Sequence, residues 1–248
     1  MLQNFESLVL IWLGIGFITF ITLLKIPAPY GKFSKTNWGP MIPSKLGWIV
    51  MEIISPLALL YFFLNGNIEK TPTNITFVSL WTLHYFNRSV IYPLRQNNPA
   101  QMPLLIAVLA FLFNVMNGYI NGTYFGSIQE YSAEYMSNWN FIVGVCLFII
   151  GAYINIKSDN ILLSLRSKSG EYKIPEGFMF RYVSFPNYLG EILEWMAFAL
   201  MTWSLAGLSF MIWTMANLVP RAIKGHQWYH DKFESYPKNR KAIFPFII

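Results

Sequence analysis

Long apolar runs recur along the whole chain and constrain its fold more than any other feature. A helix that crosses a bilayer core of about 30 Å needs about 20 mostly apolar residues. Only 12% of the residues are charged, roughly half the share found in soluble globular domains. The sequence therefore predicts an all-α polytopic membrane protein with seven transmembrane helices. The predicted spans are residues 8–24, 46–64, 75–92, 102–120, 139–156, 188–204 and 208–219.

The last two predicted spans are short and lie close together. Leu205, Ala206 and Gly207 separate them. Because backbone polar groups inside a bilayer must be satisfied within the protein, we expect a tight helical hairpin at this point.

The basic residues lie on one side of the predicted membrane. If the N-terminus is outside, every one of the 18 Lys and Arg residues except Lys70 falls in a cytoplasmic segment. The outer loop 121–138 holds Glu130 and Glu134 and no base. This positive-inside bias predicts an outer N-terminus and a cytoplasmic C-terminus.

The polar parts of the chain favour one membrane domain over residues 1–248. The net charge of +6 follows the ends of the apolar runs, so we expect membrane lipid rather than nucleic acid as its partner. Cys146 is the single cysteine, which excludes an internal disulfide. The cytoplasmic loop 157–187 and the tail 221–248 are the segments available to form a cap over a ligand.

Several polar residues interrupt the apolar runs. Such groups cost free energy inside a bilayer and usually face a cavity or a partner. They come from four predicted helices, near the cytoplasmic half, so together they could line a pocket open to the cytoplasm. They are Glu52, His84, Tyr85, Arg88, Asn155, Asp159, Asn187, Glu191 and Glu194.

Most of these residues also have a structural interpretation; Glu191 and Glu194, for example, could meet interfacial water or bases of the inner loop. Glu52 could form an ion pair with Arg88 that only holds two helices together. Asn155 and Asp159, at i, i+4 spacing, could simply terminate the fifth helix. Tyr85 alone would suit the aromatic belt of a membrane interface.

Common cofactor and metal motifs are absent from the sequence. The pair His226 and His230 has i, i+4 spacing, but no cysteine or third histidine stands near it, so we expect no metal site. Gly14 and Gly16 lie within the first span and lack the third glycine of a dinucleotide-binding fingerprint.

Longer motifs resemble those of the steroid 5α-reductase (3-oxo-5α-steroid 4-dehydrogenase) family, and they follow the family's order along nearly the whole chain. In the C-terminal part they are INIKSDNIL (154–162), YKIPEGFMFRYVSFPNYLGEILEW (172–195), MTWSL (201–205) and RAIKGHQWYHDKFESYPKNRKAIFPFI (221–247). Upstream they are APYGK (28–32), MEIISP (51–56) and LHYFNRSVIYPLR (83–95).

The resemblance implies a seven-helix reductase that takes NADPH from the cytoplasm and 3-oxo-Δ4 steroids, or similar lipid enones, from the bilayer. Glu52 and Tyr85 match the pair that hydrogen-bonds the steroid ketone, and Glu191 and Trp195 match residues around the nicotinamide and the substrate. The positions that match cofactor-binding residues are Arg88, Asn155, Asp159, Arg166, Tyr172, Lys173, Asn187, Arg221, His226 and Tyr229. Lys173 stands where the family often has Arg, which replaces a bidentate phosphate contact with a point charge.

Hydride transfer to the β-carbon of an enone moves negative charge onto the ketone oxygen. Two donors aimed at that oxygen stabilise the enolate, by about 3–4 kcal/mol per donor. Tyr85 can donate as a neutral phenol, and Glu52 can donate in its protonated form, which apolar surroundings favour. Arg166, Lys173 and Arg221 could meet the cofactor phosphates, although positive-inside topology alone would also explain them.

Other functions remain open at this stage. The alternatives are a membrane reductase of enoyl-CoA or sterol double bonds, an isoprenylcysteine-type membrane methyltransferase, and a seven-helix receptor or lipid-binding scaffold. We expect a functional monomer in a bacterial inner membrane or an endoplasmic reticulum membrane.

Overall fold

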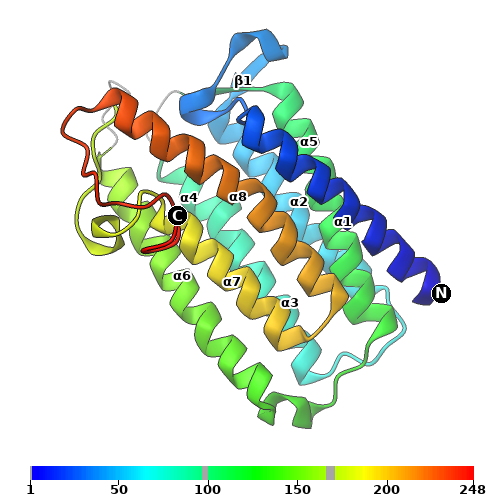
Figure 1. The fold of residues 1–248 in the computed structure, drawn as a ribbon. Coiled ribbons are helices and arrows are strands. Elements are labelled where there is room, and N and C mark those ends of the chain that lie inside the picture. Colours follow the sequence, from blue (N-terminus) through cyan, green and yellow to red (C-terminus); the bar gives the residue numbers. More distant parts are fainter. Residues whose placement is uncertain (1, 97–99, 166–170) are drawn as a thin grey trace. The chain divides into compact units, whose positions relative to one another are not determined.

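Helices dominate the part of the chain that the computed structural model describes, residues 2–96, 100–165 and 171–248 (Figure 1). The longer helical segments fall where the sequence predicts spans. The helical elements are α1 (Leu2–Lys25), η1 (Gly31–Phe33), η2 (Thr36–Trp38), α2 (Ser44–Leu64), α3 (Pro72–Phe86), η3 (Asn87–Ile91), α4 (Tyr92–Leu94), α5 (Leu104–Thr123), η4 (Tyr124–Ile128), η5 (Ala133–Ser137), α6 (Trp139–Leu165), η6 (Phe178–Arg181), α7 (Pro186–Thr202) and α8 (Leu205–Lys232). Two short strands, β1 (Met41–Pro43) and β2 (Gln101–Pro103), pair antiparallel.

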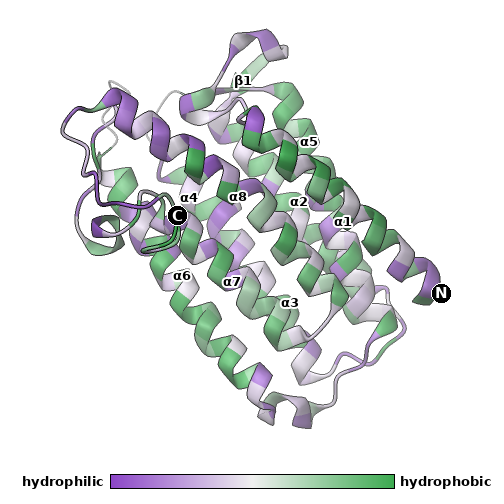
Figure 2. Ribbon diagram, viewed as in Figure 1, coloured by the Kyte–Doolittle hydropathy of each residue, from purple (hydrophilic) through white to green (hydrophobic). Residues whose placement is uncertain are grey.

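The hydropathy of the helices fits a membrane protein. Among the described residues, four segments are long and apolar enough to cross a bilayer: Leu2–Lys25, Ser44–Leu64, Leu104–Ile128 and Trp139–Leu165. Figure 2 shows α6 as mainly hydrophobic along its length, whereas the last turns of α8 are hydrophilic. The prediction of an all-α membrane protein is confirmed. The count of seven spans and the orientation of the termini stay predictions.

The chain forms two compact units. The first unit consists of Met1–Val9 and Ala28–Ile142, and the second consists of Leu10–Pro27 and Val143–Ile248. Helix α1 therefore gives its first turns to one unit and the rest to the other.

The first unit is built around the packing of α2 against α5. A Cβ placed on Gly118 of α5 would lie 2.6 Å from the Cβ of Ala58 and 2.9 Å from the backbone nitrogen of Leu59, so the two helices meet through backbone. Helix α3 also packs on α2. It begins at Pro72, where the side chain of Thr71 accepts a hydrogen bond from the backbone nitrogen of Asn74 at 3.2 Å, as an N-cap residue does.

Two local features of this unit differ from the predicted spans. The predicted fourth span starts at Met102, but residues 101–103 are extended in β2 and α5 begins at Leu104. The predicted third span is one helical path that passes from α3 into the π-helical turn η3 and on into α4. Isolated π turns inside helices are often found at functional sites.

The second unit contains α7, α8 and most of α1 and α6. Trp213 of α8 donates from Nε1 to the backbone oxygen of Trp12 at 3.1 Å, and the two indole rings lie 4.6 Å apart. Gly16 faces the same indole, because a Cβ there would lie 3.0 Å from Trp213. This contact joins α1 to α8 within the unit.

The tight hairpin between α7 and α8 exists, but its turn comes earlier than the sequence predicts. Trp203 adopts a left-handed conformation with φ of 45° and ends α7. Ser204 then caps α8 by accepting a hydrogen bond from the backbone nitrogen of Gly207 at 2.9 Å. Leu205, Ala206 and Gly207, predicted to form the turn, are therefore the first helical residues of α8. The side chain of Ser204 satisfies a backbone N–H that would otherwise lack a partner.

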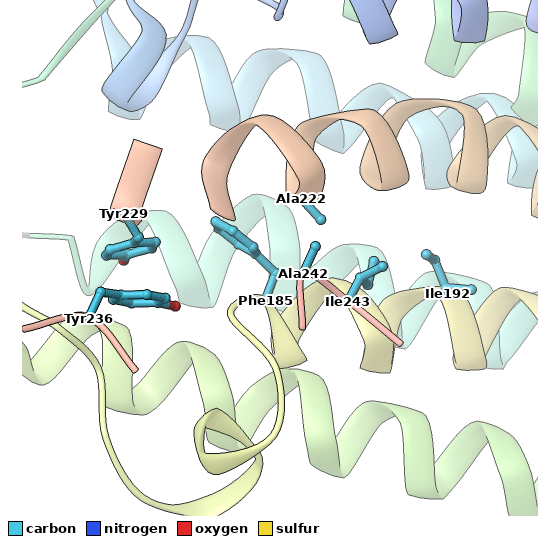
Figure 3. Close-up of a cluster of buried hydrophobic side chains, with 7 residues drawn as sticks. All are labelled: Phe185, Ile192, Ala222, Tyr229, Tyr236, Ala242 and Ile243. Carbon is cyan, nitrogen blue, oxygen red and sulfur yellow. The ribbon is translucent and has the colours of Figure 1, made fainter. Parts of the chain in front are cut away.

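The segment before α7 and the tail after α8 are joined by backbone hydrogen bonds. The nitrogen of Ser184 donates to the oxygen of Lys241 at 2.8 Å, and that of Phe185 donates to Ala242 at 3.1 Å. A buried apolar cluster lies beneath this junction (Figure 3) and contains Phe185, Ile192, Ala222, Tyr229, Tyr236, Ala242 and Ile243. The two segments predicted to form a cap thus pack on each other, while the single domain that was predicted over 1–248 stays a prediction.

Candidate active site

Tyr85 occupies a buried position near the end of α3, in the first unit. Its side chain is 4% exposed. The ring stacks on Trp81 with centroids 5.6 Å apart, and Trp81 is itself fixed by a hydrogen bond from Nε1 to Ser55 Oγ of α2 at 3.1 Å. The phenol is therefore held inside the unit and does not face lipid as an interface-belt residue would.

Asn114 of α5 connects this phenol to the backbone beside Glu52. Tyr85 donates from its hydroxyl to Asn114 Oδ1 at 3.3 Å. Asn114 Nδ2 donates to the backbone oxygen of Met51 at 2.7 Å. Met51 precedes Glu52 in α2, and the Glu52 side chain is half-buried. Two hydrogen bonds thus link the predicted donor Tyr85 to the helical turn that carries the predicted donor Glu52.

Arg88 lies in the π-helical turn that follows Tyr85. Its guanidinium carbon sits 5.4 Å from the ring centre of Trp48 and 5.3 Å from that of Tyr92. Ser89 donates from Oγ to the backbone oxygen of Tyr85 at 2.7 Å, which stabilises the turn. The aromatic rings hold the cation by cation–π attraction. The cofactor-binding role predicted for Arg88 stays a prediction.

A second polar cluster lies between α6 and α7, in the second unit. Asn155 of α6 donates from Nδ2 to the backbone oxygen of Asn187 at 2.9 Å. Asn187 of α7 donates from its own Nδ2 to Asp159 Oδ1 at 3.0 Å. The side chains of Asn155 and Asp159 are 1% and 3% exposed. The structure therefore brings together three of the predicted cofactor-binding residues, and Asn155 and Asp159 do more than terminate α6.

Two glycines allow this cluster to form. A Cβ on Gly190 of α7 would lie 2.5 Å from the backbone nitrogen of Asn155 and 2.7 Å from the backbone oxygen of Gly151. A Cβ on Gly151 of α6 would lie 2.7 Å from the oxygen of Gly190. The backbones of α6 and α7 are in direct contact there, which places the amides of Asn155 and Asn187 within hydrogen-bonding distance.

The cluster also contains buried acceptors that the protein does not use. Asn187 Oδ1 and Ser158 Oγ are buried and have no hydrogen-bond partner among the residues that the structure describes. Buried polar atoms are satisfied in the great majority of cases, so these two atoms are suited to a bound polar molecule. Ser158 shares the helix face of Asn155, three residues away.

The basic residues predicted to meet phosphates lie on α8 and the segment before α7. Arg221 donates from Nε to the hydroxyl of Tyr188 at 3.0 Å, which fixes the plane of its guanidinium. Tyr172 packs edge-on against Trp228, with ring centres 5.0 Å apart. Lys173 is exposed, and Arg166 lies outside the residues that the structure describes.

His226 belongs to a short hydrogen-bonded chain on the same unit. Its Nδ1 lies 2.6 Å from Ser184 Oγ, and Ser184 Oγ lies 2.6 Å from the hydroxyl of Tyr236. Burial lowers the pKa of His226 below its ordinary value, and electrostatic repulsion from His230 and Lys241 lowers it further. The histidine is therefore kept neutral more readily than an exposed one.

Three further predicted residues have different surroundings. Trp195 is buried in an aromatic group with Phe210, at 4.5 Å between ring centres, and with Phe148. Tyr229 is buried and stacks on Tyr236 (Figure 3) at 5.1 Å. Glu191 is half-buried on α7. Their predicted contacts with substrate or cofactor stay predictions.

Sequence reasoning missed Asn114, Ser158 and Ser184. Asn114 is one of two amides, with Asn117, that interrupt the apolar run 102–120, and that interruption was a usable signal. Ser158 could have been found from its spacing to Asn155, because residues three apart share a helix face. The role of Ser184 could not be predicted from its neighbours in the sequence, because its hydrogen-bond partners His226 and Tyr236 are distant in the chain. Within residues 2–96, 100–165 and 171–248, no group of three or more His, Cys, Asp or Glu side chains could hold a metal ion.

Comparison with known proteins identifies the family. The sequence pattern of the family described as 3-oxo-5-alpha-steroid 4-dehydrogenase matches residues 100–248. The steroid 5-alpha-reductase DET2 of Solanum lycopersicum is 43% identical, over 98% of this chain and 96% of its own length. The 3-oxo-5-alpha-steroid 4-dehydrogenase 1 of Rattus norvegicus is 37% identical, over 94% of this chain and 91% of its own length. The chain therefore belongs to the 3-oxo-5-alpha-steroid 4-dehydrogenase family and is an oxidoreductase that acts on carbon–carbon bonds of the CH–CH type.

Proposed function

We propose that the chain reduces the Δ4 double bond of 3-oxo-Δ4 steroids, or of similar lipid-soluble enones, with NADPH. Relatives that share its length carry the names steroid 5-alpha-reductase and 3-oxo-5-alpha-steroid 4-dehydrogenase. The observation that supports the chemistry best is the buried phenol of Tyr85, which Asn114 links to the turn that carries Glu52.

A donor pair of this kind suits the charge that develops during enone reduction. As the β-carbon gains a hydride, negative charge moves onto the ketone oxygen, and a preorganised donor stabilises it by about 3–4 kcal/mol. Tyr85 donates its phenolic hydrogen to that oxygen. Glu52 donates to the same oxygen in its protonated form. The α-carbon then takes its proton from Tyr85 or from a water molecule that Tyr85 orients.

The cluster between α6 and α7 is suited to a nicotinamide nucleotide. NADPH supplies the hydride when it is bound. The buried and unused acceptors Asn187 Oδ1 and Ser158 Oγ match the donors of a carboxamide or a ribose hydroxyl. Asn155 fixes the start of α7 through its bond to the Asn187 backbone, and Asp159 orients the Asn187 amide.

The basic side chains of the same unit suit the phosphates of the nucleotide. Arg221 presents a guanidinium whose plane is set by Tyr188, and charge-assisted contacts of this kind are about twice as strong as neutral ones. Lys173 contributes an exposed point charge. The remaining residues proposed to bind the cofactor, by the family resemblance, are Arg88, Arg166, Tyr172, His226 and Tyr229. Those proposed to lie around the nicotinamide and the substrate are Glu191 and Trp195.

The test is an assay of the purified chain in detergent that follows the absorbance of the reduced nicotinamide. We expect NADPH oxidation with progesterone or testosterone and none with the corresponding 5α-reduced products. A medium-chain enoyl-CoA serves as the rival substrate, and the product is identified by mass. Reduction of the enoyl-CoA without any reduction of the steroids would refute the proposed substrate class.

The donor roles have their own test. The double variant Glu52→Leu, Tyr85→Phe removes both hydrogen-bond donors, whereas Glu52→Gln would keep an amide N–H that can donate. Full steroid reduction by this variant would show that the assigned pair does not act on the ketone.

A further inference from the structure

Asn114 is a buried amide that the family resemblance did not single out. Its side chain is 3% exposed, in the middle of α5. Leaving an amide unsatisfied in apolar surroundings is costly, and here both ends of the amide are used. Nδ2 donates to the Met51 oxygen at 2.7 Å, and Oδ1 accepts from Tyr85 at 3.3 Å.

The backbone of α2 fixes the orientation of this amide. A backbone oxygen can only accept, so Asn114 must turn its nitrogen toward Met51 and its oxygen toward Tyr85. An amide oxygen can only accept as well, so the phenol must donate. Asn114 thereby selects the protonated phenol and points its hydrogen in one direction.

The turn that Asn114 holds is also a weak point of α2. Pro56 has no N–H to donate to the carbonyl of Glu52, four residues earlier, and a proline ring crowds that carbonyl. The helix can therefore bend at Glu52. The bond from Asn114 to Met51 ties this turn to α5, with which α2 is in close contact at Gly118.

We propose, on the basis of the proposed function, that Asn114 is a positioning residue that sets the direction and distance of Tyr85 relative to Glu52. The hydroxyl contact of 3.3 Å is longer than the usual O–H···O distance of about 2.7–2.8 Å. It is therefore weak enough to be exchanged for a ketone oxygen when substrate binds. Asn114 fixes the position of the phenol before substrate binds. The phenolic hydrogen then bonds to the ketone oxygen instead of to Asn114 Oδ1.

The test is a double-mutant cycle with Asn114→Ala, Tyr85→Phe and the combined variant, measured as kcat and KM for the steroid. We expect Asn114→Ala to lower kcat roughly tenfold in the parent chain and to change KM much less. In the Tyr85→Phe background the same change should alter kcat by less than about twofold, because coupled residues do not act independently.

Asn114→Asp provides the rescue. A protonated carboxyl can donate to Met51 and accept from Tyr85 as the amide does, whereas a carboxylate cannot donate. We therefore expect this variant to approach parent activity at low pH and to lose it as pH rises, relative to the parent profile. Asn121→Ala is the matched control, since Asn121 is buried on the same helix and donates to Asn117 O, and its kcat should stay within about twofold of the parent.

The outcomes are distinct. An equal loss of kcat with and without the phenol would make Asn114 merely structural, and an unchanged kcat in Asn114→Ala would also overturn the inference. If the parent chain reduces the steroid and either of these two results is obtained, the role of Asn114 is refuted and the proposed function is not. A parent that reduces no enone refutes the proposed function, and the inference falls with it.

Discussion

A methyl group added at Gly190 tests the contact that builds the proposed cofactor site. In Gly190→Ala the new carbon would lie 2.5 Å from the backbone nitrogen of Asn155 and 2.7 Å from the oxygen of Gly151. Non-bonded heavy atoms rest at about 3.5–4.0 Å, so α6 and α7 must move apart by about 1 Å. Neither obstacle is a flexible side chain, because both atoms belong to the backbone of α6.

That displacement has two consequences of known size. Overpacking of this kind costs about 1–3 kcal/mol of stability. The bond from Asn155 Nδ2 to Asn187 O, now 2.9 Å, would lengthen to about 3.9 Å, beyond the range in which such bonds are effective. With the bond to Asp159 weakened as well, we expect the Kd for NADPH to rise roughly tenfold.

The assay is a titration of the detergent-solubilised protein with NADPH, followed by tryptophan fluorescence, together with a thermal unfolding curve. Gly14→Ala is the matched control, because a Cβ there has no neighbour within 4 Å and alanine favours a helix by up to about 1 kcal/mol. If Gly190→Ala and Gly14→Ala showed the same Kd and the same Tm, the close approach of α6 and α7 would not be what forms the site.

Three further outcomes follow from the same geometry. Glu52→Leu, which leaves no hydrogen-bond donor at this position, should reduce kcat by about a hundredfold, the loss expected for one donor to a developing oxyanion; a parent-like kcat would remove Glu52 from the mechanism. Asp159→Ala should raise the KM for NADPH more than it lowers kcat, since the carboxylate orients the Asn187 amide, and the reverse pattern would argue against a cofactor role. His226 has a folded-state pKa below the ordinary value of about 6.5, so the unfolded chain binds its proton first and this contribution to stability is complete above that pH and lost as pH falls below it. Tm should therefore drop more steeply on acidification in the parent than in His226→Gln, and parallel curves would contradict the assignment.

The helices could be predicted from the sequence because they depend on local composition. Runs of apolar residues located the spans, and the spacing of Asn155 to Asp159 put both side chains on one face of α6. The turn between α7 and α8 was misplaced because Leu205–Gly207 looks like a break by composition. The capping bond from Gly207 to Ser204 decides instead that helix begins there, and composition does not reveal such a bond.

The contacts between helices could be predicted only in part. The resemblance pointed to Asn155, Asp159 and Asn187, and the structure brings them together. The local sequence does not predict the hydrogen bond between Tyr85 and Asn114, because the two residues lie on different helices and neither belongs to a repeating pattern. The π-helical turn after Tyr85, which packs on α2, was not predicted either.

The junction between the segment before α7 and the tail has a consequence for biosynthesis. The partners of Ser184 and Phe185 are Lys241 and Ala242, and the whole α7–α8 hairpin lies between them in the sequence. The hairpin is synthesised first, and these backbone bonds can form only after Lys241 and Ala242 have left the ribosome. A chain that ends before Lys241 would therefore lack the partners of Ser184 and Phe185 and could not form this junction.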